Sequence, residues 1–423
     1  MRPVAPQRLP APQPSHPAIV RELRAFQWNG RPTRRAITSV GLAKSRPIVV
    51  ETFVNEFWTS KQRAAHSLHE VSYRACFKPQ LPRFFIDRFT TPGDVVYDPF
   101  MGRGTTVIEA ALAGRMPAGC DINPLSAMLA QPRLAPPTED DVARRLSAID
   151  LSRTASYPRE LEVFYHPETL REICALRDYL LLRDNDGTID NIDRWIRMVA
   201  VNRLTGHSPG FFSVYTLPPN QATTLDAQAK INARRKQVPP RRDVPRLILG
   251  KTRSLLADCD AATRATLLRS ANRAALLTHP ASSTPEIKAG SVSLVVTSPP
   301  FLDIVNYAGD NWLRGWFCGI DTSTVKISMH RKVEDWQATM TGVFQELARV
   351  LRPGGHVAFE VGEVRGGKVK LEEAVLPCGV ASGLEPLLVV INSQAFTKTA
   401  NCWGVRNNAK GTNTNRIVVF RKG

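Results

Sequence analysis

The stretch Val95-Val96-Tyr97-Asp98-Pro99-Phe100-Met101-Gly102-Arg103-Gly104-Thr105-Thr106 decides the fold class of this chain. Its first three residues are apolar and mostly β-branched, as is typical of a buried strand. Gly102 and Gly104 permit a tight turn and let a ligand approach bare backbone, and residues 107–112 continue as an apolar helix. This order of strand, glycine turn and helix predicts an α/β sheet with a ligand at the carboxyl ends of its strands.

A second predicted strand, over residues 117–120, ends at an acid. Asp121 lies 23 residues after Asp98, about the offset at which an acidic residue reaches ribose hydroxyls in nucleotide-binding βαβ units. Phosphate-binding motifs fit less well, because Val107 replaces the third glycine of Gly-x-Gly-x-x-Gly and no Gly-Lys-Ser/Thr follows this turn. The pattern therefore favours adenosine with a cationic tail, which describes S-adenosylmethionine.

A second turn, Thr297-Ser298-Pro299-Pro300-Phe301, follows the apolar run of residues 291–296, which has the length and type of a buried parallel strand. Neither proline has an N–H to donate, so the strand ladder stops here. A hydroxyl, carbonyl groups and an aromatic ring remain at the carboxyl edge of the sheet, which is the edge where open α/β sheets bind ligands.

Together, Asp98-Pro99-Phe100-x-Gly102-x-Gly104-Thr105 and Ser298-Pro299-Pro300-Phe301 resemble the S-adenosylmethionine-dependent DNA amino-methyltransferases of the N4-cytosine and N6-adenine type. The resemblance covers residues 60–130 and 290–421. It implies an α/β, Rossmann-like class I methyltransferase with a mostly parallel, seven-stranded sheet whose last strand is antiparallel. It places residues 77–79 beside the methionine moiety, Phe100 in the cofactor pocket and Asp121 on the ribose. The implied cofactor-binding residues are Phe77, Lys78, Pro79, Asp98, Pro99, Phe100, Gly102, Gly104, Thr105 and Asp121.

The second turn has the groups that methylation of a base amine requires. The amine is a poor nucleophile because its lone pair is delocalised into the ring, so an enzyme must localise that pair and aim it at the methyl group. The Ser298 hydroxyl and the Pro299 carbonyl can accept the two amino hydrogens, and Phe301 can stack on the extruded base. The predicted catalytic residues are Ser298, Pro299, Pro300 and Phe301. In the family that this turn resembles, serine at the position of Ser298 favours cytosine N4 as the target and aspartate favours adenine N6. Cytosine N4 is therefore preferred, and adenine remains an alternative.

Residues 135–289 lie outside the resemblance, and apolar spacing predicts helices near 139–149, 158–182, 190–204 and 253–277. We interpret them as an inserted, mainly helical target-recognition region. Residues 230–246 carry seven basic side chains and one acid, which favours phosphate contact. The predicted DNA-binding residues are Lys230, Arg234, Arg235, Lys236, Arg241 and Arg242. Residues 206–221 are rich in aromatics and amides, so they either contact bases or form a packed loop; Trp403 likewise either stacks on the base or is structural.

Composition supports a nucleic-acid partner. The formal net charge of the 423 residues is +18 and the sequence pI is about 10.0, which suits double-stranded DNA. We expect residues 1–47 to form a disordered basic arm, and residues 48–134 and 290–423 to form the catalytic domain. The chain has no apolar run that would predict a membrane span and no secretory signal. Its seven cysteines contain no Cys-x-x-Cys pair, which favours a reducing cytoplasm and no metal site.

Three other functions compete with DNA amine methylation. An RNA base methyltransferase can carry a similar turn, although no RNA-binding module is apparent. A catalytically silent DNA-binding protein would not need intact Gly102, Gly104 and Ser298. A cytosine-carbon methyltransferase needs a cysteine nucleophile, and Cys378 falls after the expected fifth strand rather than at the catalytic strand end. The resemblance further implies a bacterial or phage origin and a cognate restriction endonuclease as a partner; the sequence does not determine the oligomeric state.

Overall fold

The computed structural model describes residues 17–42, 45–59, 65–74, 76–152, 156–216, 222–302, 307–328, 330–364, 369–393 and 414–423. The expectations for Trp403 and for residues 217–221 fall outside these ranges. No helix within them is long and apolar enough to cross a bilayer.

A nine-stranded sheet forms the centre of the described structure, in the order β3-β4-β12-β13-β9-β8-β5-β6-β7. Seven of these strands form the predicted methyltransferase sheet: β7 (Ala275–Leu277), β6 (Met116–Cys120), β5 (Val95–Asp98), β8 (Val292–Thr297), β9 (Leu351–Val361), β13 (Thr414–Lys422) and β12 (Leu384–Ser393). Among them only β13 runs antiparallel to its neighbours, β9 and β12. The predicted fold class is therefore confirmed, including the antiparallel last strand.

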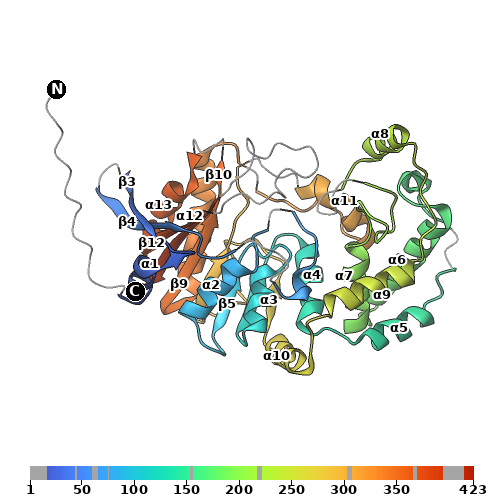
Figure 1. The fold of residues 1–423 in the computed structure, drawn as a ribbon, viewed down its shortest axis with the longest axis horizontal. Coiled ribbons are helices and arrows are strands. Elements are labelled where there is room, and N and C mark those ends of the chain that lie inside the picture. The colour runs from blue at the N-terminus through green and yellow to red at the C-terminus, as the bar shows by residue number, and fades with distance from the viewer. Residues whose placement is uncertain are drawn as a thin grey trace.

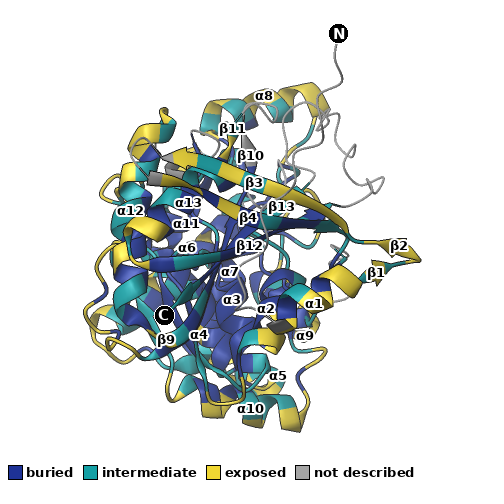
Figure 2. Cartoon of the chain, turned by 90° about the vertical axis from the view of Figure 1, so that its left-hand side faces the viewer, coloured by how far each residue is buried: buried dark blue, intermediate teal, exposed yellow. Residues whose placement is uncertain are grey.

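The N-terminal region adds two strands that were not predicted from the sequence. β4 (Ser45–Asn55) pairs in parallel with β12, and β3 (Arg34–Leu42) pairs antiparallel with β4 at the edge of the sheet. α1 (Pro17–Ala25) precedes them and buries Ile19 and Leu23. The expectation of a disordered arm over residues 1–47 is wrong for the described residues 17–42 and 45–47, because α1 packs by these two side chains and β3 pairs with β4. Figure 2 shows that β3 is largely exposed while β12 is buried.

Helices cover both faces of the sheet, so its central strands are apolar on both sides. On one face, α2 (Gln80–Phe89) packs with Leu294 and Val296 of β8. On the other face, α12 (Val333–Val350) and α13 (Leu371–Ala381) pack with Val295 of the same strand. This alternation explains why the run before Ser298 is continuously apolar.

A helical lobe lies beside the sheet (Figure 1). It contains α5 (Glu139–Ala148), α6 (Pro167–Asn185), α7 (Asn191–Val201), α8 (Leu225–Arg235) and α9 (Val244–Leu255). It also receives α11 (Tyr307–Cys318), which follows the Ser298 turn in sequence and buries Leu313 and Phe317 in the core of the lobe. That core continues into α3 (Thr105–Leu112) and α4 (Pro124–Leu134), so the lobe packs directly against the helices that follow β5 and β6.

The predicted C-terminal boundary of the inserted region, residue 289, is wrong. The single helix expected over residues 253–277 is two helices and a strand: the end of α9, α10 (Ala261–Ala271) and β7. Asp260 caps α10 by accepting a bond from the Thr263 amide, which starts a new helix. β7 then joins the sheet beside β6, so the insertion ends before the third strand of the methyltransferase sheet.

Candidate active site

The glycine turn and the Ser298 turn meet at one edge of the sheet, although they lie about two hundred residues apart in sequence. β5 and β8 are parallel neighbours, with Val96 opposite Leu294. At their carboxyl ends the Thr297 hydroxyl donates to Asp98 Oδ1 over 2.6 Å. The Phe100 amide donates to the same oxygen over 3.1 Å. Burial of Asp98 raises the pKa of its carboxyl to about 7. Asp98 therefore joins the two motifs and shapes the turn after β5.

Both turn glycines adopt positive φ, a conformation that suits the tight turn expected from the sequence. Gly102 has φ +49° and Gly104 has φ +78°. A Cβ on Gly104 would approach Ala130 Cβ of α4 to 2.8 Å, whereas one on Gly102 would meet the Tyr73 ring at 3.6 Å. Gly104 is thus required both by its backbone conformation and by the close packing of α4. Tyr73, which belongs to neither sequence motif, lies against the turn.

Asp121 follows β6 and supports the glycine turn from the next strand. Its carboxylate accepts from the Gly102 amide and from the Asn123 amide, each over 2.9 Å. Burial raises the pKa of the Asp121 carboxyl, and the two amide bonds oppose that rise. The acid that was predicted to hold a ribose therefore lies directly beside the glycine turn. The ribose contact itself remains a prediction.

The predicted methionine-side segment, residues 77–79, leads into α2 at Pro79. Burial lowers the pKa of the Lys78 ammonium, and the nearby Arg103 guanidinium lowers it further. Arg103 is itself buried and donates to the carbonyls of His69 and Val71. Two cations thus lie close together beside the glycine turn, where they suit the carboxylate of an amino-acid moiety. The sequence predicts Lys78 for this role but not Arg103.

The Ser298 side chain contacts a buried carboxylate from the adjacent strand. Its hydroxyl donates to Glu360 Oε2 over 2.5 Å, and Asn415 Nδ2 donates to Glu360 Oε1 over 3.0 Å. Glu360 lies on β9 and Asn415 on β13. The sequence predicts both strands but neither site residue. The available signal was an acid that directly follows the apolar run of residues 357–359 near the end of a strand.

The rest of the Ser298 turn is bonded to α12 and packs on the core. Trp336 of α12 is buried and donates its indole N–H to the Pro300 carbonyl over 2.9 Å. Pro299 is buried, while Ser298 and Phe301 stay partly exposed. The Phe301 ring packs at the margin of the core beneath α12. The turn is therefore rigid and keeps a hydroxyl and a ring accessible at the sheet edge.

The six predicted DNA-binding residues separate into two groups. Lys230, Arg234, Arg235 and Lys236 are exposed at the C-terminal end of α8, and Arg235 stacks over the Tyr215 ring at 3.8 Å. Arg241 pairs with Glu168 over 2.9 Å and also with Glu172, while Arg242 is partly buried. The charge of Arg241 is thus neutralised within the protein. Among the six residues, Arg241 therefore has the weakest support as a DNA-binding residue.

The aromatic loop before α8 is a packed loop as far as the structure describes it. Phe211 and Phe212 are buried, and Arg203 lies over the Phe211 ring at 4.0 Å. A Cβ on Gly206 would come within 2.4 Å of the Phe211 ring. Of the two alternatives for these aromatics, the structure supports packing over base contact. Trp312 of α11 likewise bonds inside the protein, to the Thr223 carbonyl.

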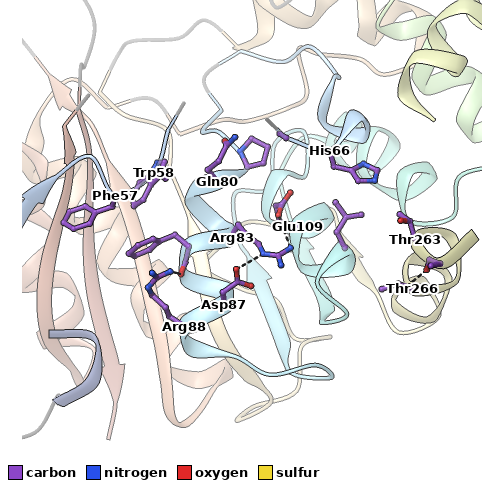
Figure 3. A pocket seen from close by; sticks show the side chains of 15 residues that line it. Phe57, Trp58, His66, Gln80, Arg83, Asp87, Arg88, Glu109, Thr263 and Thr266 are labelled. Atoms are coloured by element: carbon purple, nitrogen blue, oxygen red, sulfur yellow. Dashed lines mark hydrogen bonds and ion pairs between the residues drawn. The ribbon is translucent and has the colours of Figure 1, made fainter. Parts of the chain in front are cut away.

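A cavity of about 680 Å³ lies along α2, α3 and α10 (Figure 3). Arg83 in its wall pairs with Asp87 over 2.8 Å and approaches Glu109 to 4.0 Å. Apart from Pro79, its lining contains none of the predicted catalytic or cofactor-binding residues. The cavity is therefore separate from the two motif turns, and its size does not make it the active site.

Residues 43–131, which contain β5, the glycine turn and β6, match a family model for DNA methylases of the N6/N4 type. This segment is therefore similar to the DNA methylases of the N6/N4 type. The match supports the assignment of the glycine turn, because the turn and its flanking strands lie inside it. The Ser298 turn lies outside the matched residues, so its assignment rests on the sequence motif and on the bond from its neighbour Thr297 to Asp98.

Similar proteins include Type II methyltransferases. The chain is 31% identical over 149 residues to the Type II methyltransferase M.MvaI of Kocuria varians, covering 34% of this chain and 29% of the relative. It is 36% identical over 76 residues to M.MjaII of Methanocaldococcus jannaschii, covering 18% of this chain and 14% of the relative. The chain thus spans less than a third of the length of these relatives. An rRNA methyltransferase structure from Streptomyces viridochromogenes is 14% identical with a TM-score of 0.34, over 86% of this chain and 94% of that one; the fold class rests instead on the strand order above.

Proposed function

We propose that this protein is a site-specific DNA methyltransferase that transfers a methyl group from S-adenosylmethionine to the exocyclic amine of a flipped base, with cytosine N4 favoured. The observation that carries the proposal is the Thr297–Asp98 hydrogen bond. It joins the glycine turn of a DNA methylase segment to a Ser-Pro-Pro-Phe turn at the ligand-binding edge of the sheet. Two ligands, one at each turn, would lie side by side.

The residues at the glycine turn fit S-adenosylmethionine, whose sulfonium supplies the methyl group. Gly102 is partly exposed and has no side chain, which lets the ligand approach its backbone closely, and Asp121 beside it provides an acceptor for ribose hydroxyls. Phe100 offers a partly buried ring, and Lys78 and Arg103 offer positive charge to a carboxylate. These residues fit a ligand that has a carboxylate, a ribose and an uncharged base better than they fit a dinucleotide.

At the second turn, the chain positions the base amine. Ser298 Oγ and the Pro299 carbonyl accept the amino hydrogens, which localises the nitrogen lone pair toward the methyl group. Phe301 stacks on the base, which must leave the duplex to reach this edge. Trp336 already occupies the Pro300 carbonyl, so the neighbouring Pro299 carbonyl is the one assigned to the substrate.

Serine at the first position supports cytosine over adenine, and adenine N6 is the alternative. The helical lobe serves target recognition, and double-stranded DNA is the partner that fits the net charge of +18. RNA methylation is less favoured because the family segment is that of DNA methylases. A cytoplasmic location and a cognate restriction endonuclease would follow from the similarity to Type II methyltransferases.

The decisive experiment incubates the purified protein with tritiated S-adenosylmethionine and amplified, unmethylated duplex DNA, then digests the DNA to nucleosides for mass identification. We expect the product to be N4-methyldeoxycytidine. N6-methyldeoxyadenosine would select the alternative base. Absence of label in the DNA, or 5-methyldeoxycytidine as the product, would overturn the proposal.

We predict that α8 contributes to DNA affinity through phosphate charge. The β10–β11 hairpin, Glu363–Val364 with Val369–Lys370, begins just after β9 at the active-site edge, and α8 lies at the same end of the molecule (Figures 1 and 2). Combined replacement of Lys230, Arg234 and Lys236 by Gln should weaken DNA binding. It should also reduce the slope of log affinity against log salt concentration by about one for each phosphate that is no longer neutralised. Fluorescence-anisotropy titrations of duplex DNA at several salt concentrations measure both quantities.

Arg241→Gln is the matched control for this variant, since Glu168 and Glu172 already neutralise the charge of Arg241. It should leave both the DNA affinity and the salt slope close to the wild-type values. Equal slopes in the wild type and in both variants would contradict a role for α8.

A further inference from the structure

Glu360 is a buried acid with no role in the proposed function so far. Its side chain is about 6% exposed. One carboxylate oxygen accepts from the Ser298 hydroxyl over 2.5 Å and the other from Asn415 over 3.0 Å. Ser298 directly follows β8 and Asn415 lies on β13, so the two neighbouring strands fix the carboxylate plane. Buried acids cost free energy, so Glu360 at this edge requires a reason beyond packing.

The Ser298–Glu360 bond sets the direction of the serine hydroxyl. Because the carboxylate can only accept, the hydroxyl proton must point toward Glu360. The lone pairs of Ser298 Oγ then face away from the carboxylate and are available to accept an amino hydrogen. Glu360 thereby fixes Ser298 as an acceptor toward the substrate.

Amine methylation also requires a proton acceptor. The nitrogen lone pair forms the new N–C bond, the C–S bond breaks with its electron pair kept by sulfur, and the nitrogen is left positively charged with one proton too many. We propose that Glu360 receives this proton through Ser298: the nitrogen gives its proton to Ser298 Oγ while the Ser298 hydroxyl proton passes to Glu360 Oε2. The inference rests on the proposed function and deepens it by naming the proton path.

The surroundings of Glu360 suit an acid that takes up a proton. Burial raises the pKa of its carboxyl, and the bonds from Ser298 and Asn415 oppose this only in part. In the described part of the chain, the charged groups nearby are engaged elsewhere: Arg416 pairs with Glu372 of α13. Asp98 accepts from Thr297 and from the Phe100 amide. No cation among the described contacts holds Glu360 ionised, so protonation leaves no unpaired positive charge behind.

The test is single-turnover methylation of unmethylated duplex DNA by the full-length protein, with tritiated S-adenosylmethionine, across pH. Wild-type rates should fall on the acidic side as Glu360 becomes protonated, at a pH above the ordinary glutamate range because its pKa is raised. Glu360→Gln should lower the rate by roughly 100-fold. It should also abolish the fall in rate at acidic pH, which is the acidic limb of the pH profile. Dissociation constants for DNA and S-adenosylmethionine should stay within about twofold, which a merely structural role would not preserve.

Two further variants keep the test decisive if Glu360→Gln folds poorly. Glu360→Asp retains a carboxylate and should restore part of the rate together with the acidic limb. Asn415→Ala removes a bond to the charged form and should move the limb to higher pH.

Glu346→Gln is the matched control, because Glu346 is also about 8% exposed and accepts hydrogen bonds, but from Thr284, away from the two turns. It should leave the pH profile unchanged. An unaltered rate and limb in Glu360→Gln, or an unmoved limb in Asn415→Ala, would overturn the proton path. Absence of any DNA methylation by the wild type would instead overturn the proposed function.

Discussion

Ser298→Ala should lower the single-turnover rate of DNA methylation by roughly 100-fold while leaving S-adenosylmethionine affinity unchanged. The hydroxyl is the acceptor that localises the amine lone pair, and it acts only as the nitrogen becomes a nucleophile, so its loss appears in the rate and not in cofactor binding. The measurement pairs rapid-quench methylation with calorimetric titration of the cofactor. Full activity in Ser298→Ala would refute the catalytic assignment.

Ser293→Ala is a matched control for this variant. Ser293 lies on β8, is buried, and donates to Asp94 Oδ1 over 2.9 Å. Its replacement therefore also removes a serine–carboxylate bond, but at the amino end of β8, away from the sheet edge. We expect its methylation rate to stay within about twofold of the wild type. A comparable loss in both variants would indicate that strand distortion, and not the missing acceptor, causes the effect of Ser298→Ala.

Gly104→Ala should reduce S-adenosylmethionine affinity by at least about 30-fold. Gly104 has φ +78°, and a Cβ there would press on Ala130 Cβ at 2.8 Å, so the turn must move away from α4. Strain of this kind costs roughly 1–3 kcal/mol, and a shift of the turn misplaces the backbone that meets the ligand. Calorimetry at a temperature well below the melting transition measures the loss. An unchanged dissociation constant would place the cofactor elsewhere.

Gly114→Ala separates backbone strain from displacement of the turn. Gly114 has φ +71° but no atom within 4 Å of the added Cβ. It should lower thermal stability by about as much as positive φ alone does in Gly104→Ala, while cofactor affinity stays at the wild-type value. If Gly114→Ala weakens cofactor binding equally, the effect of Gly104→Ala reflects general destabilisation and says nothing about the site.

Local sequence was sufficient to predict the central strands and both turns. β5, β6 and β8 are short apolar runs that end in glycine, acid or proline, and such signals depend on a few adjacent residues. The N-terminal strands β3 and β4 were missed because the basic and proline-rich residues before them resemble a disordered segment. β4 acquires its structure by pairing with β12, more than three hundred residues away. The strand β7 was missed because it is short and follows α10 closely, so its apolar residues extended the helical pattern.

The amino-acid sequence by itself determined the two motifs and the order of the strands that carry them. Strand propensity, positive-φ glycines and prolines without N–H groups act within a few residues. Only the tertiary structure decided which groups face one another. Sheet order brings Thr297 to Asp98 and places Glu360 and Asn415 around Ser298. These contacts join residues 55 to 199 positions apart, because register across the sheet is set by packing on both faces and leaves no local pattern in the sequence.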